Sequence, residues 1–144
     1  MTDAAGFPPA DDPRWQTTVI ASSLELARAQ REAIAGRLAE LRLSEEHRFE
    51  IELSLEEALA NAVRHGNAGD PKRTVTIRCL LEPALVAFII EDQGTGFDPA
   101  GVPDPTTDDR LDQPGGRGIW LIRNYMDMVE YRNGGRSLYM LKRV

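Results

Sequence analysis

The sequence predicts an α+β fold, a two-layer sandwich in which helices pack on one face of a mixed, mostly antiparallel sheet. Three observations support this prediction. The chain has 144 residues, the size of a single domain. Its apolar residues recur with helical spacing in some segments and alternate in others. In chain order the segments give strand, helix, helix, strand, strand, a long loop, helix, strand and strand, which favours helices gathered on one side of a sheet.

The N-terminal half begins with a polar arm. Residues 1–14 are rich in Pro and Asp, so they are expected to form a disordered arm ahead of a folded domain at 15–144. The segment WQTTVIAS (15–22) carries β-branched residues and predicts a strand. Residues 23–43 predict a helix, because apolar side chains recur there at helical spacings. The apolar positions are Leu26, Ala29, Ala33, Ile34, Leu38 and Leu41.

A second helix is expected from Ser44, which can cap its N-terminus, to His65, which would close it as a packing or capping residue. Gly66 is expected to end this helix in the left-handed conformation. One stripe of the helix is apolar and a flanking stripe is polar. The apolar stripe holds Ile51, Leu55, Leu59 and Ala62, and the polar stripe holds Ser54, Glu57, Asn61 and His65.

The C-terminal half predicts strands and a helix around a long loop. Residues 73–82 alternate and residues 84–92 are almost entirely apolar, so they are expected to pair as antiparallel strands, the second more buried. Residues 118–129 predict an apolar helix, and residues 130–144 predict a hairpin that turns at the Asn-Gly-Gly sequence 133–135. The Gly- and Pro-rich stretch before the helix is long enough to favour a functional loop. The helix is expected to place three residues in the core: Trp120, Leu121 and Tyr125.

Composition and charge exclude several classes of function. The formal net charge of −6 argues against a nucleic-acid-binding protein, because phosphate contacts need a basic surface. A lone cysteine, Cys79, cannot form an intrachain disulfide. No apolar run approaches the ~20 residues of a membrane span, and the N-terminus lacks the pattern of a signal peptide. We therefore expect a cytoplasmic protein that binds neither membrane nor nucleic acid directly.

Glu57 and Asn61 raise the first question about function. Their spacing places both on one face of the second helix, yet Asn is a mediocre helix former because its side chain competes for backbone hydrogen bonds. Asn61 is therefore either tolerated at the edge of the core or placed there to hold a ligand. A solvated helix edge is the alternative explanation for the pair.

Two glycine-rich segments flank the long loop. The sequence DQGTG at 92–96 follows the buried strand, where a carboxylate can accept hydrogen bonds from a ligand amine and glycines allow a sharp turn beside it. The sequence GGRG at 115–118 precedes a helix, so backbone N–H groups and the helix dipole can bind an anion such as phosphate. An ordinary turn and a simple loop are the alternatives. Their order along the chain, after Glu57 and Asn61, favours one shared site.

The three segments together resemble a known family. EEALANAVRHGN (56–67), EDQGTGFDP (91–99) and GGRGIWLIRNYMDMVEY (115–131) look like the N, G1 and G2 boxes of the ATPase domain shared by histidine kinases, gyrase B, Hsp90 and MutL. This is the GHKL, or Bergerat, ATP-binding fold. The sequence most resembles the stand-alone anti-sigma-factor serine/threonine kinases, over roughly residues 15–143. The resemblance implies an ATP site beneath a flexible lid.

The resemblance also implies a role for each matching residue. Asn61 would supply an oxygen ligand to a Mg²⁺ ion on the ATP phosphates, and Glu57 would be the catalytic base toward a partner serine or threonine hydroxyl. Asp92 would receive the adenine amino group, which favours ATP over GTP. The other nucleotide-binding positions would be Gly94 and Gly96 beside the base, Gly116 and Gly118 beneath the phosphates, and Arg117, which could reach a phosphate or face water.

The resemblance implies partners as well. The chain would phosphorylate a small anti-sigma-factor antagonist, bind a sigma factor, and form a homodimer through the sheet edge or the first helix. Close relatives often carry an arginine just before the second glycine pair, where Gln113 and Pro114 stand here; Arg110 or Arg117 could substitute. The acidic stretch 104–112 is expected to be a solvated lid. The alternative function is a non-catalytic, nucleotide-dependent protein-binding module.

Overall fold

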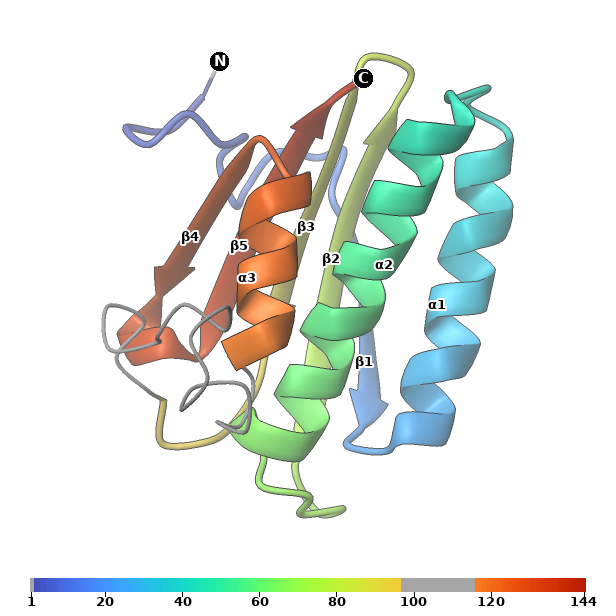
Figure 1. Ribbon diagram of the computed structural model, residues 1–144. Helices are drawn as coiled ribbons and strands as arrows, with labels where there is room; N and C mark the ends of the chain where they lie inside the picture. The colour runs from blue at the N-terminus through green and yellow to red at the C-terminus, as the bar shows by residue number, and fades with distance from the viewer. Residues whose placement is uncertain (1, 97–115) are drawn as a thin grey trace.

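Figure 1 shows the computed structural model of the chain, which describes residues 2–96 and 116–144. The described residues form a five-stranded sheet with the order β1-β2-β3-β5-β4. Helices α1, α2 and α3 lie on one face of this sheet (Figure 1). The strands are β1 (Gln16–Ala21), β2 (Thr74–Glu82), β3 (Leu85–Glu91), β4 (Met128–Arg132) and β5 (Ser137–Arg143); the helices are α1 (Leu24–Ala39), α2 (Glu45–Asn61) and α3 (Gly116–Tyr125). The predicted α+β sandwich is confirmed, and each pairing among these strands is antiparallel.

Serine caps set the start of the two long helices. The side chains of Ser23 and Ser44 each accept a hydrogen bond from a backbone N–H in the first turn, at 3.3 and 3.1 Å, which satisfies donors that lack a partner within the helix. α1 ends at Ala39, earlier than predicted, and Arg42 then takes a left-handed backbone conformation with φ 56° that leads the chain into α2. Within the described residues, no helix combines the length and the apolar character needed to cross a lipid bilayer.

The main core lies between the helices and the sheet. The predicted apolar stripe of α2 is buried, with Ile51 and Leu55 at 0% exposure. β3 contributes Phe88 to this core, whereas its neighbour Ile89 faces the opposite side of the sheet and is also buried. A strand buried on both faces has no polar alternation, so the more buried position predicted for β3 is confirmed.

α1 buries a narrower stripe than the sequence predicted. Ala27, Ile34 and Leu38 are buried, but Leu26 and Ala29 are exposed. α1 packs mainly against α2 and lies over the edge strand β1 (Figure 1). A helix with few neighbours needs only one row of apolar residues toward the core, which explains why the wider predicted stripe is wrong.

The opposite face of the sheet is covered by the N-terminal segment, where the sequence predicted a disordered arm. Phe7 is 1% exposed, and its ring centroid lies 5.6 Å from that of Tyr139 on β5. The Trp15 indole N–H donates to the carbonyl of Pro9 at 2.9 Å, which closes the segment into a loop. Pro and Asp content does not reveal this packing. The packing of this segment follows instead from the central strands, which are apolar on both faces. Their outward-facing apolar side chains are stabilised when the segment removes them from water.

The last helix differs from the prediction at both ends. α3 spans Gly116–Tyr125 instead of 118–129, since the chain has already entered β4 before residue 129. Ile119 and Ile122 face the core and are buried, whereas Trp120 is 38% exposed. The predicted core position of Trp120 is therefore wrong, because α3 turns its isoleucines toward the core and leaves Trp120 on its outer side.

Candidate nucleotide-binding site

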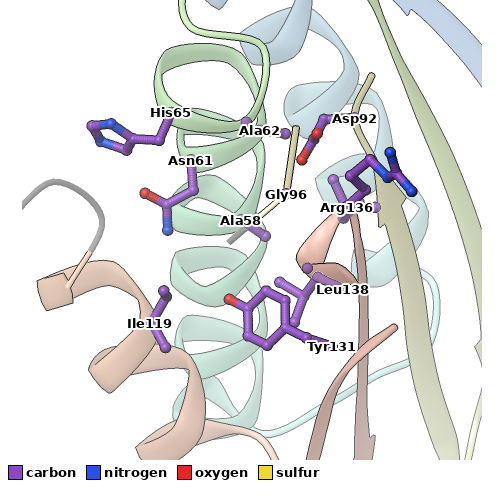
Figure 2. A pocket seen from close by; sticks show the side chains of 13 residues that line it. Ala58, Asn61, Ala62, His65, Asp92, Gly96, Ile119, Tyr131, Arg136 and Leu138 are labelled. Atoms are coloured by element: carbon purple, nitrogen blue, oxygen red, sulfur yellow. The ribbon is translucent and has the colours of Figure 1, made fainter. Parts of the chain in front are cut away.

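A cavity of about 270 Å³ lies between α2, α3 and one end of the sheet. Figure 2 shows Asn61 and His65 projecting from the helical side, with Asp92, Tyr131 and Arg136 on the sheet side. Residues from all three segments that the sequence singled out line this cavity. The lining residues are Ala58, Asn61, Ala62, His65, Gly66, Ile90, Asp92, Gly96, Ile119, Tyr131, Gly135, Arg136 and Leu138.

The end of α2 widens into a π-helical turn over Ala62–Gly66. The carbonyl of Ala62 accepts the N–H of the residue after this turn at 2.8 Å, and such turns are frequent at functional sites. The prediction that Gly66 is left-handed is wrong, because the chain reverses further on, at Ala68 (φ 52°). A glycine is needed at position 66 for another reason: a Cβ there would collide with the carboxylate of Asp92.

Asp92 follows β3, with its carboxylate against the backbone of Gly66. Its Oδ1 accepts the N–H of Gly94 at 2.9 Å. Burial raises the pKa of Asp92 above its ordinary value, while the Gly94 N–H and the charges of Arg136 and Arg73 act in the opposite direction. A carboxylate partly withdrawn from water is a strong hydrogen-bond acceptor. The site therefore suits a ligand that brings an N–H group to Asp92.

The glycines that follow Asp92 are required by close backbone approach. Gly94 lies against the carbonyl oxygen of Gly66, and a Cβ on Gly94 would overlap that oxygen. Gly96 has a φ of 81° and lies against the carbonyl oxygen of Gly134. Gly134 belongs to the β4–β5 hairpin, whose turn at 133–135 is confirmed. The chain after β3 is thus held against both the end of α2 and this hairpin.

Glu57 and Asn61 meet at the first turn of α3. A Cβ on Gly118 would lie 2.7 Å from Oε2 of Glu57 and 3.0 Å from Nδ2 of Asn61, so both side chains lie against the glycine backbone. Gly116 and Arg117 precede Gly118 in the same turn, and the Arg117 side chain is exposed. The first N–H groups of a helix lack internal partners. A carboxylate, an amide and a helix N-terminus therefore share one small region.

The Asn61 amide is suited to hold a cation bound to phosphate. Its Nδ2 is buried without a hydrogen-bond partner among the described residues, so this NH₂ group is available to donate to a ligand oxygen such as that of a phosphate. The amide oxygen of the same side chain is the atom that could bind a cation. Mg²⁺ in nucleotide sites takes one or two oxygen ligands from protein and the rest from phosphates and water. Asn61 can supply one such ligand through its amide oxygen. The described part of the chain has no cluster of three His, Cys, Asp or Glu side chains for a metal, so the other ligands would have to be phosphate oxygens and water.

Asn67 joins three elements around the site, although it is not among the site residues predicted from the sequence. Its side chain is fully buried, at 0% exposure. Nδ2 donates to Ser22 Oγ at 3.0 Å and to the carbonyl of Thr74 at 2.9 Å, while Oδ1 accepts the N–H of Gln93 at 2.7 Å. Its signal in the sequence is a polar residue directly after the helix end. Asn67 fixes the position of the Asp92 loop relative to α2 and β2.

Tyr131 and Arg136 line the cavity from the hairpin and were also missed. Burial raises the pKa of Tyr131 well above its usual range, so its hydroxyl stays protonated. The carbonyl of Arg136 accepts the N–H of Asp92 at 2.9 Å. His65, expected to pack or cap, instead lines the cavity with an exposed ring. Burial and then the charge of Arg64 lower the pKa of His65, which favours the neutral imidazole.

Part of the predicted site lies outside the described residues. The acidic stretch 104–112, with Arg110 in it, and the positions Gln113 and Pro114 fall there. The cavity is lined by residues on either side of that stretch.

A groove of about 180 Å³ runs between α1 and α2 beside Glu57. Its walls carry three arginines, Arg28, Arg31 and Arg64, and its remaining lining residues are Leu24, Ala27, Glu56, Glu57, Leu59 and Ala60. Glu57 lines this groove and touches Gly118, whereas Asn61 lines the cavity. Glu57 therefore lies between the cavity and the groove.

Comparisons with known proteins agree with this geometry. Residues 20–142 match the family model described as histidine kinase-like ATPase domain. The chain is similar to the anti-sigma F factor of Bacillus cytotoxicus, at 37% identity over 103 residues, covering 69% of this chain and 70% of the relative. It is also similar to the anti-sigma F factor of Oceanobacillus iheyensis, at 32% identity over 120 residues, covering 79% of this chain and 82% of the relative.

Proposed function

We propose a function for this chain from a finding that the comparisons establish: it belongs to the histidine kinase-like ATPase family. It is a cytoplasmic, ATP-dependent serine/threonine kinase that phosphorylates a small anti-sigma-factor antagonist and binds a sigma factor in a partner-switching system. The observation that carries this proposal is the meeting of Glu57, Asn61 and Gly118 beside the cavity that contains Asp92. A carboxylate at that point serves phosphoryl transfer, whereas nucleotide binding alone does not require it.

ATP lies in the cavity with its adenine at Asp92 and its phosphates at the first turn of α3. The carboxylate accepts a hydrogen bond from the adenine amino group and would oppose the carbonyl oxygen of guanine, so ATP is preferred to GTP. Gly94 and Gly96 let the backbone approach the base. The N–H groups of residues 116–118 bind phosphate oxygens at the positive end of the helix dipole, and Arg117 adds a positive charge beside them.

Glu57 accepts the proton of the partner hydroxyl as that oxygen attacks the γ-phosphorus. The new oxygen–phosphorus bond forms, the bond from the γ-phosphorus to the β–γ bridging oxygen breaks, and ADP leaves with the electron pair. Asn61 would hold Mg²⁺ through its amide oxygen, and the bound ion would neutralise phosphate charge. Gly118 allows Glu57 and Asn61 to approach the phosphate site together, since any side chain there would displace them.

The partner docks on the groove beside Glu57. The three arginines of this groove outnumber its two glutamates on a chain whose net charge is −6, and this local excess of positive charge favours an acidic protein surface. Because Glu57 lines the groove, a hydroxyl carried on such a surface would be within reach of the base. The sigma factor and the antagonist would compete for this region, and neither membrane nor nucleic acid takes part directly.

The edge of the sheet supports a homodimer. β1 is an edge strand paired with β2, and Val19 on it is 59% exposed. Leu24 and Leu26 at the start of α1 are 40% and 43% exposed. Exposed apolar residues beside an open strand edge favour pairing with a second copy. A mass that stays monomeric at every protein concentration in analytical ultracentrifugation would contradict the homodimer.

A second candidate function rests on one sequence feature. Gln113 and Pro114 stand where relatives of this type often carry an arginine, and loss of a cation near the γ-phosphate would slow transfer more than binding. The chain would then be a nucleotide-dependent binding module in which ATP shapes a partner surface without being cleaved.

Label transfer separates the two candidates. The wild-type chain and Glu57→Gln are incubated with ATP labelled at the γ-phosphate and individually purified antagonist proteins. The kinase predicts label on a serine or threonine of one antagonist with the wild type and none with Glu57→Gln. Stable complexes with ATP and antagonist, but no labelled antagonist at any time, would reject the kinase in favour of the binding module.

A further inference from the structure

The outer face of the sheet, away from the helices, carries an apolar cluster that the N-terminal segment covers. Figure 1 shows this segment on the side of the sheet opposite α1 to α3. It forms no strand, so its contacts are made by side chains and by turns within the segment. The cluster consists of Phe7 from the segment with Leu80, Ala87, Ile89, Tyr139 and Leu141 from the sheet.

Residues Asp3–Phe7 form a compact turn, which we call the N-terminal clasp. The side chain of Asp3 accepts hydrogen bonds from the N–H groups of Ala5 and Phe7, both at 3.0 Å. The Gly6 N–H donates to the Asp3 carbonyl at 3.0 Å. Gly6 has a φ of 100° and packs against the end of Met128, leaving little room for a side chain. The clasp is therefore a defined structure seated at the start of β4.

Arg132, the last residue of β4, joins the clasp to the sheet. Its guanidinium donates to Asp3 at 2.8 Å and to Glu130 at 3.0 Å. The same group lies 3.9 Å from the ring centroid of Tyr139 and 5.6 Å from that of Phe7. Burial alone would lower the pKa of Arg132, but the hydrogen bonds to Asp3 and Glu130 raise it. Two carboxylates and two rings hold this cation, so its position is well determined.

Arg132 does not line the nucleotide cavity itself, but its neighbours along the chain do. The preceding residue, Tyr131, lines the cavity, and so do Gly135 and Arg136 in the turn that follows. This turn, residues 133–136, is tied to the adenine side of the site. The Arg136 carbonyl accepts the Asp92 N–H at 2.9 Å, and the Gly134 carbonyl lies against Gly96.

We propose that the N-terminal clasp positions this cavity wall, so that docking of the clasp and binding of ATP strengthen each other. With the clasp seated, Arg132 is held from the outer face, and the turn 133–136 keeps Asp92 and Gly96 in place for the base. When the clasp detaches, Arg132 loses Asp3 and the ring of Phe7, and the turn gains freedom that ATP must remove again on binding. The clasp can open without breaking a strand, because it pairs with none.

Coupling of this kind is reciprocal. If the seated clasp raises the affinity for ATP by a given factor, then ATP raises the stability of the seated clasp by the same factor. This effect distinguishes a positioning role from a merely structural one. If the clasp only covered apolar surface, ATP bound on the other side of the sheet would not change the stability of the seated clasp.

The test measures both directions of the coupling. Asp3→Asn keeps the acceptor for the Ala5 and Phe7 N–H groups but removes the charge that holds Arg132, and we expect the Kd for ATP to rise three- to tenfold by calorimetry. Phe7→Ala removes the buried ring, and we expect a larger rise. The matched control is Arg14→Ala, which breaks exposed ion pairs of the same segment with Asp12 and Glu82 and should leave the Kd unchanged.

The effect of ATP on the clasp is measured by hydrogen exchange with mass spectrometry. In the wild type, saturating ATP should slow exchange of the N–H groups of the clasp and leave the exposed start of α1 unaffected. The coupling would be overturned if ATP left the hydrogen-exchange rate of the clasp unchanged and Asp3→Asn bound ATP with the wild-type Kd. The inference rests on the proposed nucleotide site, and a wild-type chain that bound no ATP would overturn that site and the coupling together.

Discussion

Replacing Asp92 by Asn tests how the site recognises its base. The Gly94 N–H, 2.9 Å from Oδ1, determines how the new amide is oriented, because an N–H donor needs an oxygen opposite it. The NH₂ group therefore takes the place of Oδ2, and a donor meets the adenine amino group where an acceptor stood. A hydrogen bond to a charged group contributes about 1.5–3 kcal/mol, which corresponds to a rise in Kd of about 10- to 150-fold.

The assay is calorimetric titration with ATP and Mg²⁺ at constant pH. Asp11→Asn makes the same chemical change at an exposed aspartate and serves as the matched control, which should bind like the wild type. A Kd for Asp92→Asn within threefold of the wild-type value would refute the assignment of adenine to Asp92.

Thermal stability provides an internal check on the same variant. Burial raises the pKa of Asp92 above the value of 3.8 typical of an unfolded chain, so the ionised carboxylate is disfavoured in the folded state. Wild-type stability relative to Asp92→Asn should therefore fall as the pH rises from about 3.8 through the raised pKa of the folded state, and stay constant above it. At neutral pH we expect the Tm of Asp92→Asn to equal or exceed that of the wild type. A lower Tm would show that the affinity loss comes from damage to the fold.

The remaining predictions concern the phosphate side and the support of the site. Glu57→Gln should reduce label transfer about 10²- to 10⁴-fold while the Kd for ATP stays within twofold; parallel loss of both would indicate a structural role. Gly118→Ala should slow transfer with little change in Tm, because the added Cβ would push on the flexible end of the Glu57 side chain. Gly36→Ala is the control, since no atom lies within 4 Å of the Cβ it would add. It should leave transfer unchanged and raise the free energy of unfolding by about 0.5–1 kcal/mol. Asn67→Ala should lower the free energy of unfolding by about 2–4 kcal/mol in urea, because three hydrogen bonds of a buried side chain are lost; a loss below 0.5 kcal/mol would contradict its joining role.

The elements of the fold were predictable because their signals are local. Ser44 and the apolar stripe through Ile51 and Leu55 define α2 by themselves, and an uninterrupted apolar run defines β3 as a central strand. The ends were harder to predict. Residues 128 and 129 are apolar enough for a helix, and their place in β4 is decided by pairing with β5 across the hairpin.

The candidate site residues that belong to short motifs could be predicted from the sequence. Those that reach the site only through tertiary contacts were missed. The residues that the motifs singled out lie in segments with recognisable spacing. The structure places Asn61, Asp92 and Gly96 on the cavity wall, and it places Glu57 and Gly118 next to Asn61 rather than on that wall. Asn67, by contrast, acts through partners on three separate elements. Its local signal, a polar residue directly after the helix end, does not identify those partners.

The same limit applies to the cover of the outer face. The N-terminal segment looks disordered in isolation because it is rich in Pro and Asp. Phe7 is buried only because β2, β3 and β5 present an apolar outer face to it, and that face exists only after the sheet has formed.

We propose above all that this chain holds ATP through Asp92 and a phosphate-bound Mg²⁺ ion through Asn61. Calorimetric titration of the wild type with ATP and with GTP, each with and without Mg²⁺, tests it most directly. We expect binding that is specific for ATP and strengthened by Mg²⁺, with the Mg²⁺ effect lost in Asn61→Ala. Equal affinity for ATP and GTP, or no binding of either under any of these conditions, would contradict it.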